Sequence, residues 1–210
     1  MRVIAGEAKG RRLKGPPSIE TRPMADKIKE ALFSSLGSLA DEPDTVLDLY
    51  AGTGGVGIEA LSRSATWADF VEQSPAACAV IRANLDATNF AKISQVHQIP
   101  VSVFLKRAPS AGRVYDLVIL DPPYADPAIV ATLARVASSR LVQSGSIVAF
   151  GHWPKLALPE RIGRMVQLRS RCHGDSCFSV YEITDEQPAA ETGDTETPEG
   201  RADETRDLSR

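Results

Sequence analysis

The residues best suited to chemistry in this chain of 210 residues are Asp121-Pro122-Pro123-Tyr124. An exocyclic amino nitrogen on a base is a weak nucleophile because its lone pair is conjugated into the ring. Two acceptors aimed at its N–H bonds can localise that pair and stabilise the charge that develops during attack. The Asp121 carboxylate and the Pro122 carbonyl can supply these acceptors, because the prolines restrict the turn. Tyr124 offers a face for an extruded base, so these residues predict amine chemistry if the fold places them beside a cofactor.

A glycine-rich loop is the second candidate, and it supplies the place for a cofactor. Gly52, Gly54 and Gly57 form a G-x-G-x-x-G pattern between a strand-like and a helix-like segment, with Thr53 inside it. Missing Cβ atoms let the backbone turn tightly against a ligand. Glu72 ends the next strand-like segment, where its carboxylate can accept hydrogen bonds from both ribose hydroxyls. The pattern predicts binding of an adenosine-containing cofactor.

Asp48, just before this loop, distinguishes between cofactor classes. A carboxylate there suits a cationic, amino-acid-bearing cofactor better than an anionic pyrophosphate. Asp48 therefore favours S-adenosylmethionine, while a dinucleotide cofactor and a ligand-free turn remain open alternatives.

Alternating strand and helix patterns must position these residues. The alternation predicts an α/β fold, a Rossmann-like parallel sheet with helices on both faces. In such sheets ligands collect at the carboxyl ends of the strands, where Asp121 and the glycine loop both fall. The expected strands are 45–50, 67–72, 94–98, 115–120 and 146–150, with a closing antiparallel pair at 165–171 and 177–184. The expected helices end near residues 37 and 63, span 74–89 and 127–139, and include a short one carrying Phe104 and Leu105.

Charge is unevenly distributed, although the net formal charge is only −3. Residues 185–210 hold nine acids and three bases among few large apolar residues, which predicts a disordered acidic tail. The other residues then carry 21 bases and 18 acids, a net +3. The first 14 residues resemble a short hairpin, and their basic strip suits contact with RNA phosphates, although it could also serve only solubility. The strip comprises Arg2, Lys9, Arg11, Arg12 and Lys14.

Four motifs stand out when the chain is taken as a whole: Thr21-Arg22-Pro23-Met24-Ala25-Asp26-Lys27-Ile28-Lys29-Glu30-Ala31-Leu32-Phe33, Leu47-Asp48-Leu49-Tyr50-Ala51-Gly52-Thr53-Gly54, Gly57-Ile58-Glu59-Ala60-Leu61-Ser62-Arg63 and Asp121-Pro122-Pro123-Tyr124. Together they resemble the RsmD family of bacterial methyltransferases, which modify N2 of one guanine in 16S ribosomal RNA. The resemblance covers residues 2–184 and implies a class I methyltransferase sheet with an N-terminal β-hairpin and helix extension. It also implies S-adenosylmethionine as cofactor, base handling by the Asp-Pro-Pro-Tyr turn, and places for Arg22 and Asp26 beside the cofactor and substrate entrance.

The chain departs from the family pattern at three places. Met24 and Ala25 stand where Thr or Ser is frequent, and His173 stands where Tyr is frequent. Ile99-Pro100 replaces the acid that often meets the adenine amino group, so backbone groups or Gln98 must serve there.

These patterns together predict three segments: a basic hairpin and helix (1–38), a methyltransferase domain (39–184) and a tail (185–210). We expect a cytoplasmic monomer with reduced thiols and no membrane span, acting on 16S rRNA within a partly assembled small subunit. A zinc site at Cys172, His173 and Cys177 has only weak support from spacing. DNA adenine, a protein glutamine and a noncatalytic RNA-binding role remain alternatives.

Overall fold

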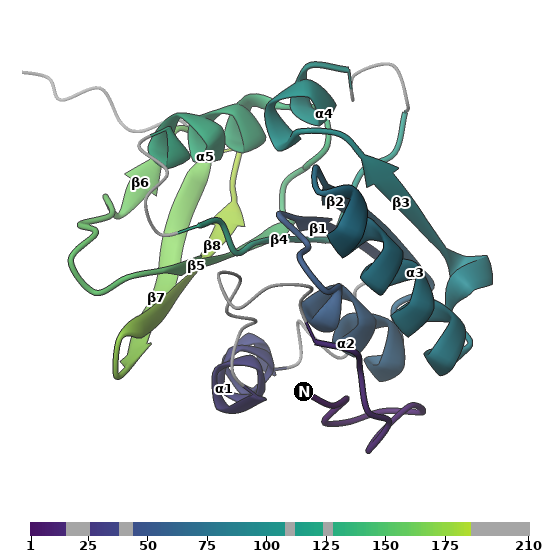
Figure 1. Ribbon diagram of the computed structural model, residues 1–210. Coiled ribbons are helices and arrows are strands. Elements are labelled where there is room, and N and C mark those ends of the chain that lie inside the picture. Colours follow the sequence, from purple (N-terminus) through teal and green to yellow (C-terminus); the bar gives the residue numbers. More distant parts are fainter. Residues whose placement is uncertain (16–25, 38–43, 108–111, 124–127, 186–210) are drawn as a thin grey trace, which may run out of the picture.

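The computed structural model describes residues 1–15, 26–37, 44–107, 112–123 and 128–185. Its elements are α1 (Asp26–Leu36), β1 (Thr45–Leu49), α2 (Gly55–Arg63), β2 (Trp67–Glu72), α3 (Pro75–Thr88), η2 (Ala91–Ile93), β3 (Ser94–Gln98), α4 (Val101–Arg107), β4 (Leu117–Leu120), α5 (Ile129–Ser138), β5 (Ile147–His152), β6 (Arg161–Ile162), β7 (Met165–His173) and β8 (Ser176–Ile183). Over these residues, one sheet has the strand order β3-β2-β1-β4-β5-β8-β7-β6. Helices α1, α2 and α3 cover one side of it, and α4 and α5 cover the other (Figure 1).

The first five strands are parallel, and the remaining strands extend the sheet in antiparallel fashion from β5 through β8 and β7. The Rossmann-like α/β sheet predicted from the alternating pattern is therefore confirmed. The carboxyl ends of β1, β2, β4 and β5 meet at one edge, which is where the glycine loop, Glu72 and Asp121 were predicted to meet.

Strand β4 shows why a continuous apolar run predicts burial on both faces. Its four residues are all buried. Ile119 packs into the core beneath α1, α2 and α3, whereas Val118 and Leu120 pack into the core beneath α4 and α5. The strand begins two residues later than predicted. Asp116 precedes it, and the Asp116 carboxylate accepts hydrogen bonds from the Thr45 backbone and hydroxyl.

The predicted closing pair is confirmed as β7 and β8, but the expectation of reduced thiols there is wrong. Cys172 and Cys177 stand opposite each other in the β7–β8 ladder and form a disulfide. The expectation rested on cellular compartment, whereas strand register decides which thiols meet. Cys78 is free and buried. No group of metal-ligating side chains occurs among the described residues, which leaves the zinc hypothesis without support.

The N-terminal hairpin is also present, as a tight loop closed by a single bridge between Arg2 and Arg12. The Val3 amide donates to the Arg11 carbonyl, and the Gly10 amide donates to the Val3 carbonyl. Within the described ranges, no helix is long and apolar enough to cross a bilayer. The three-segment division stays a prediction, and the tail lies outside the described residues except for Asp185.

Candidate active site

The glycine loop connects β1 to α2 through backbone conformations that favour glycine. Gly52 has φ 55° and Gly54 has φ 74°, both in the left-handed region. Gly54 is also the N-cap of α2, so the amides of the first helical turn face the loop. A Cβ atom on Gly52 would meet only the Tyr50 carbonyl oxygen, at 3.9 Å. The loop therefore offers a close backbone approach to a ligand, as the sequence predicted.

Gly57 has a different role from its two neighbours. A Cβ there would lie 2.5 Å from Cε1 of Phe70 on β2, which real atoms do not tolerate. Phe70 is fully buried. Gly57 thus lets α2 pack closely on the sheet, and the cofactor contact predicted for it stays a prediction.

The predicted cofactor carboxylate Asp48 is 2% exposed and lies beneath the loop. Its Oδ2 accepts a hydrogen bond of 2.9 Å from the Gly57 amide. Burial raises the pKa of this carboxyl well above its ordinary value, although the Gly57 bond opposes the shift. The nearby charges of Asp121 and Glu72 raise the pKa further. Asp48 therefore holds the start of α2 against β1, and direct contact with a cofactor stays a prediction.

Glu72 meets the loop from the end of β2, as predicted. Its Oε2 accepts from the Gly52 amide at 3.0 Å, and its Oε1 accepts from the Ser74 amide at 2.8 Å. Each oxygen keeps a further lone pair. The carboxylate is thus fixed beside the loop and can still accept ribose hydroxyls. Gln98 pairs with Glu72 in the β2–β3 ladder, so its exposed amide lies at the same edge.

Asp121 and Pro122 follow β4 at the same edge. The Asp121 amide lies 3.5 Å from the Leu49 carbonyl oxygen of β1. Asp121 keeps a partly exposed edge, but burial raises the pKa of its carboxyl to about 6. The Asp121 charge also raises the pKa of Asp48 beneath the glycine loop. The structure therefore places Asp121 beside the loop, which is the juxtaposition that amine chemistry requires.

Tyr124 and Arg22 lie outside the described residues. Asp26 is the first residue of α1, but its side chain is also outside them. Their predicted roles stay predictions.

The N-terminal hairpin that carries the basic strip lies on the same side of the sheet as α1 and α2 (Figure 1). Its members Arg2, Lys9, Arg11 and Arg12 are all exposed. Arg11 donates to the Ala87 carbonyl near the end of α3 at 2.8 Å. The strip is therefore held on the helices that support the loop, while RNA contact by these four residues stays a prediction.

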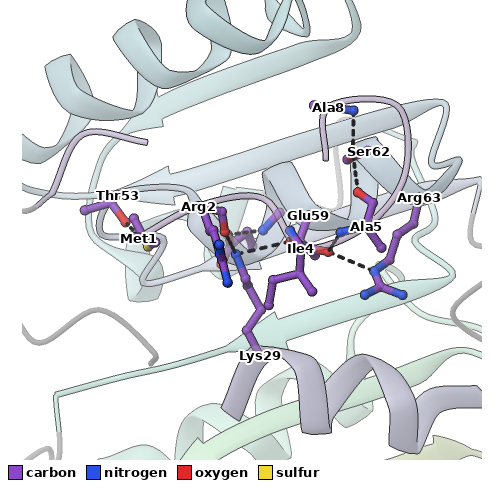
Figure 2. A network of polar contacts seen from close by, with 12 residues as sticks. Met1, Arg2, Ile4, Ala5, Ala8, Lys29, Thr53, Glu59, Ser62 and Arg63 are labelled. Atoms are coloured by element: carbon purple, nitrogen blue, oxygen red, sulfur yellow. Dashed lines mark hydrogen bonds and ion pairs between the residues drawn. The ribbon is translucent and has the colours of Figure 1, made fainter. Parts of the chain in front are cut away.

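Sequence reasoning missed the residues that anchor this hairpin. Glu59 of α2 is fully buried and accepts from the Ile4 and Ala5 amides at 2.8 and 2.9 Å. It also forms ion pairs with Lys29 at 3.2 Å and Arg63 at 3.0 Å. Figure 2 shows these partners converging on Glu59. The signal available in the sequence was a Glu on the apolar face of α2, four residues before an Arg.

Two further contacts join the hairpin to the glycine loop itself. Buried Asn84 of α3 accepts from the Lys14 amide and donates to the Lys14 and Thr53 carbonyls. The Met1 sulfur lies 3.7 Å from the hydroxyl of Thr53, which is itself buried (Figure 2). A Cβ on Gly55 would come within 2.8 Å of that sulfur. The N-terminal segment is therefore packed against the predicted cofactor site.

Comparison with known proteins agrees with this geometry. A family model described as conserved hypothetical protein 95 matches residues 1–182. The putative rRNA methyltransferase YlbH of Bacillus subtilis (strain 168) is 33% identical over 182 residues, covering 87% of this chain and 98% of the relative. The ribosomal RNA small subunit methyltransferase D of Escherichia coli (strain K12) is 32% identical over 182 residues, covering 87% and 89%. The chain belongs to the RsmD family.

Solved structures of similar proteins support the same fold for this RsmD family member. A putative methyltransferase, yhhF from Escherichia coli, superposes with a TM-score of 0.77 at 26% identity, covering 89% of this chain and 99% of that chain. A hypothetical protein of Thermus thermophilus gives a TM-score of 0.75 at 30% identity, covering 87% and 99%. The sheet and its flanking helices are thus a class I methyltransferase fold.

Proposed function

We propose that this protein transfers a methyl group from S-adenosylmethionine to the N2 amino group of a guanine in 16S ribosomal RNA. The relatives named as rRNA methyltransferases support the class of reaction and of substrate. The guanine N2 target follows from the resemblance to the RsmD family. One observation carries the chemistry: Asp121 follows β4 at the carboxyl edge of the sheet, where its amide lies 3.5 Å from the carbonyl oxygen of Leu49, the residue that ends β1 before the glycine loop.

The charges around the loop favour this cofactor over a dinucleotide. Glu72 and Asp121 both raise the pKa of Asp48, so three carboxyl groups are close together at this edge. A pyrophosphate would add negative charge to that group, whereas a sulfonium and an ammonium would offset it. The adjacent N-terminus of α2 suits the single carboxylate of the cofactor's methionine portion.

Within this arrangement, each described residue has a definite role. Glu72 would bind the ribose hydroxyls, and the backbone at Gly52, Thr53 and Gly54 would bind the methionine portion. The bound cofactor supplies an electrophilic methyl group on sulfur. Asp121 and the Pro122 carbonyl accept the two N–H bonds of the guanine amine and so direct its lone pair toward that methyl. Asp121 then holds the proton that the alkylated nitrogen releases and passes it to water.

We further propose that the substrate is a partly assembled small subunit and that the protein acts as a monomer. The exposed basic strip on the N-terminal hairpin suits a phosphate-rich partner, because each neutralised phosphate releases counterions.

The decisive experiment is methyl transfer from labelled S-adenosylmethionine to rRNA and to partly assembled small subunits, both from a strain that lacks this protein. We expect label at one guanine N2 with the wild-type protein, and loss of about 10²-fold or more in rate with Asp121→Ala. Circular dichroism must show that the variant remains folded. Full activity of Asp121→Ala would refute the assigned chemistry. Preferential labelling of duplex DNA or of a protein glutamine in a parallel competition would refute the substrate.

A further inference from the structure

A β-bulge in β7 turns a row of basic side chains toward the side of the sheet that carries Asp121. Before the bulge, Gln167 pairs with Tyr181, whose ring packs in the core beneath α4 and α5. The register then shifts by one residue, and Arg169 pairs with Val180, which packs in the core beneath α1, α2 and α3. Directly paired residues of a ladder point to the same side. In a regular ladder without the bulge, Leu168 would pair with Val180 and Arg169 with Ser179, so Arg169 would point to the opposite side.

The residues beyond the bulge continue this alternation. Arg171 pairs with Phe178 and His173 pairs with Ser176, so both share the side of Arg169. All three are exposed, and we call them the β7 strip. Arg169 donates to the Ser35 carbonyl in the last turn of α1 at 2.6 Å, which fixes the base of the strip. Within the described part of the chain, no ion pair or hydrogen bond engages the Arg171 guanidinium.

Strand register also places the strip relative to the active site. Leu120 of β4 pairs with Phe150 of β5, so the next residues, Asp121 and Gly151, are neighbours. Gly151 pairs with Phe178, and Phe178 pairs with Arg171. Asp121 and Arg171 therefore lie in one row, three strand spacings or about 14 Å apart. Alternation from Ile119 gives Asp121 the same side of the sheet as Arg171.

The hairpin that carries the strip is held firmly at this edge. His152 ends β5, and its Nδ1 bonds to the Trp153 carbonyl. Its Nε2 shares a hydrogen bond of 2.9 Å with the Ser179 hydroxyl, and a hydrogen bond of 3.0 Å joins Ser179 to Ser170. This chain of hydrogen bonds crosses β5, β8 and β7 on the side opposite the strip, so it fixes the hairpin without using the basic residues.

We infer that the β7 strip is a second RNA-binding surface, which contacts the phosphates next to the target guanine while the base occupies the site at Asp121. This inference rests on the proposed function. Two arginines along an exposed strand suit phosphate oxygens by charge and by geometry. The N-terminal hairpin, which carries the other basic strip, lies on the same side of the sheet, beyond α1 (Figure 1). The substrate RNA is therefore held on both sides of α1.

The test compares Arg171→Ala with Arg135→Ala, which removes the same charge from the exposed side of α5 on the other side of the sheet. Binding of 16S rRNA and of small subunits, both from a strain lacking the protein, is measured over a series of salt concentrations. We expect Arg171→Ala to weaken binding several-fold and to reduce the slope of log K against log salt by about 0.7 to 0.9 per lost phosphate contact. Arg135→Ala should leave both unchanged, and neither variant should alter affinity for S-adenosylmethionine.

An unchanged slope in Arg171→Ala, or an equal change in both variants, would overturn the inference. Tighter RNA binding by Arg171→Ala would also overturn it, because it would indicate that the acidic residues of 185–210 occupy the strip. Methyl transfer by the wild-type protein is measured on the same RNA. Absence of that activity would refute the proposed function itself, whereas activity together with an unchanged slope would refute only the second surface.

Discussion

The raised pKa of Asp121 makes the pH dependence of the reaction a direct test of the site. Burial disfavours the charged form, so the pKa rises from an ordinary value of 3.8 to about 6. Catalysis requires the carboxylate, so activity should increase as the pH rises through about 6. The carboxylate fraction would be about 90% at pH 7 and about 10% at pH 5.

We therefore expect kcat/KM for S-adenosylmethionine to fall about tenfold between pH 7 and pH 5, since this ratio reports ionisations of the free enzyme. With a pKa of 3.8 the fall would be less than about 10%. Carbon-13 NMR of the Asp121 carboxyl in the free protein would measure the same pKa independently. A flat rate from pH 7 to pH 5 in a protein that stays folded would refute the reasoning.

Asp121→Asn separates this carboxyl from its neighbours, because it keeps an acceptor oxygen and removes the ionisation. The variant should be slower, and its kcat/KM should no longer rise with pH near pH 6. If the rise of kcat/KM near pH 6 persists in Asp121→Asn, it reports the ionisation of another group, such as the buried Asp48. The pKa of Asp121 is higher in the folded protein than in the unfolded chain, so its ionisation lowers the free energy of unfolding as the pH rises from 3.8 through about 6. Asp121→Asn should therefore raise the free energy of unfolding at pH 7, by at most about 2 to 3 kcal/mol.

Three other substitutions test the supporting structure. Gly57→Ala should lower the free energy of unfolding in urea by about 1 to 3 kcal/mol, because its Cβ would lie 2.5 Å from Phe70. Gly15→Ala, with nothing within 4 Å of its Cβ, is the matched control, and an equal loss in both would contradict the packing argument. Glu72→Gln should weaken S-adenosylmethionine binding, measured by calorimetry, about tenfold or more, because an amide is a weaker acceptor than a carboxylate for the ribose hydroxyls and for the loop amide. Undiminished affinity would show that Glu72 does not bind the cofactor. Glu59→Gln should destabilise the fold by about 3 to 5 kcal/mol, since it leaves the buried Lys29 and the partly buried Arg63 without their carboxylate partner. A change below about 1 kcal/mol would show that the network is dispensable.

Local sequence signals predicted much of the architecture, because they depend on residues close together in the chain. Strand and helix periodicity gave β2 and β3 with their observed bounds and placed most other elements within a few residues. The two-residue strand β6 and the three-residue helix η2 are too short to carry a periodic signal, and both were missed. Ser74 and Asn89, which flank α3, cap it as their types suggest.

The sequence by itself determined which residues could do chemistry. Gly52 and Gly54 are required where the backbone adopts positive φ, and Glu72 and Asp121 fall where strands of a parallel sheet end. These features follow from side-chain type and from alternation along the chain. They were therefore readable without knowing which strands are neighbours.

Only the tertiary structure decided how distant segments use those residues. The carboxylate of Asp48 is engaged by the Gly57 amide, Glu59 anchors a segment more than 50 residues away, and Cys172 meets Cys177. The bulge at Leu168 determines which side of the sheet Arg171 shares with Asp121. Each depends on strand register or helix packing, and a shift of one residue would reverse the side to which a strand residue points. Because strand register could not be read from a single sequence, these contacts could not be predicted.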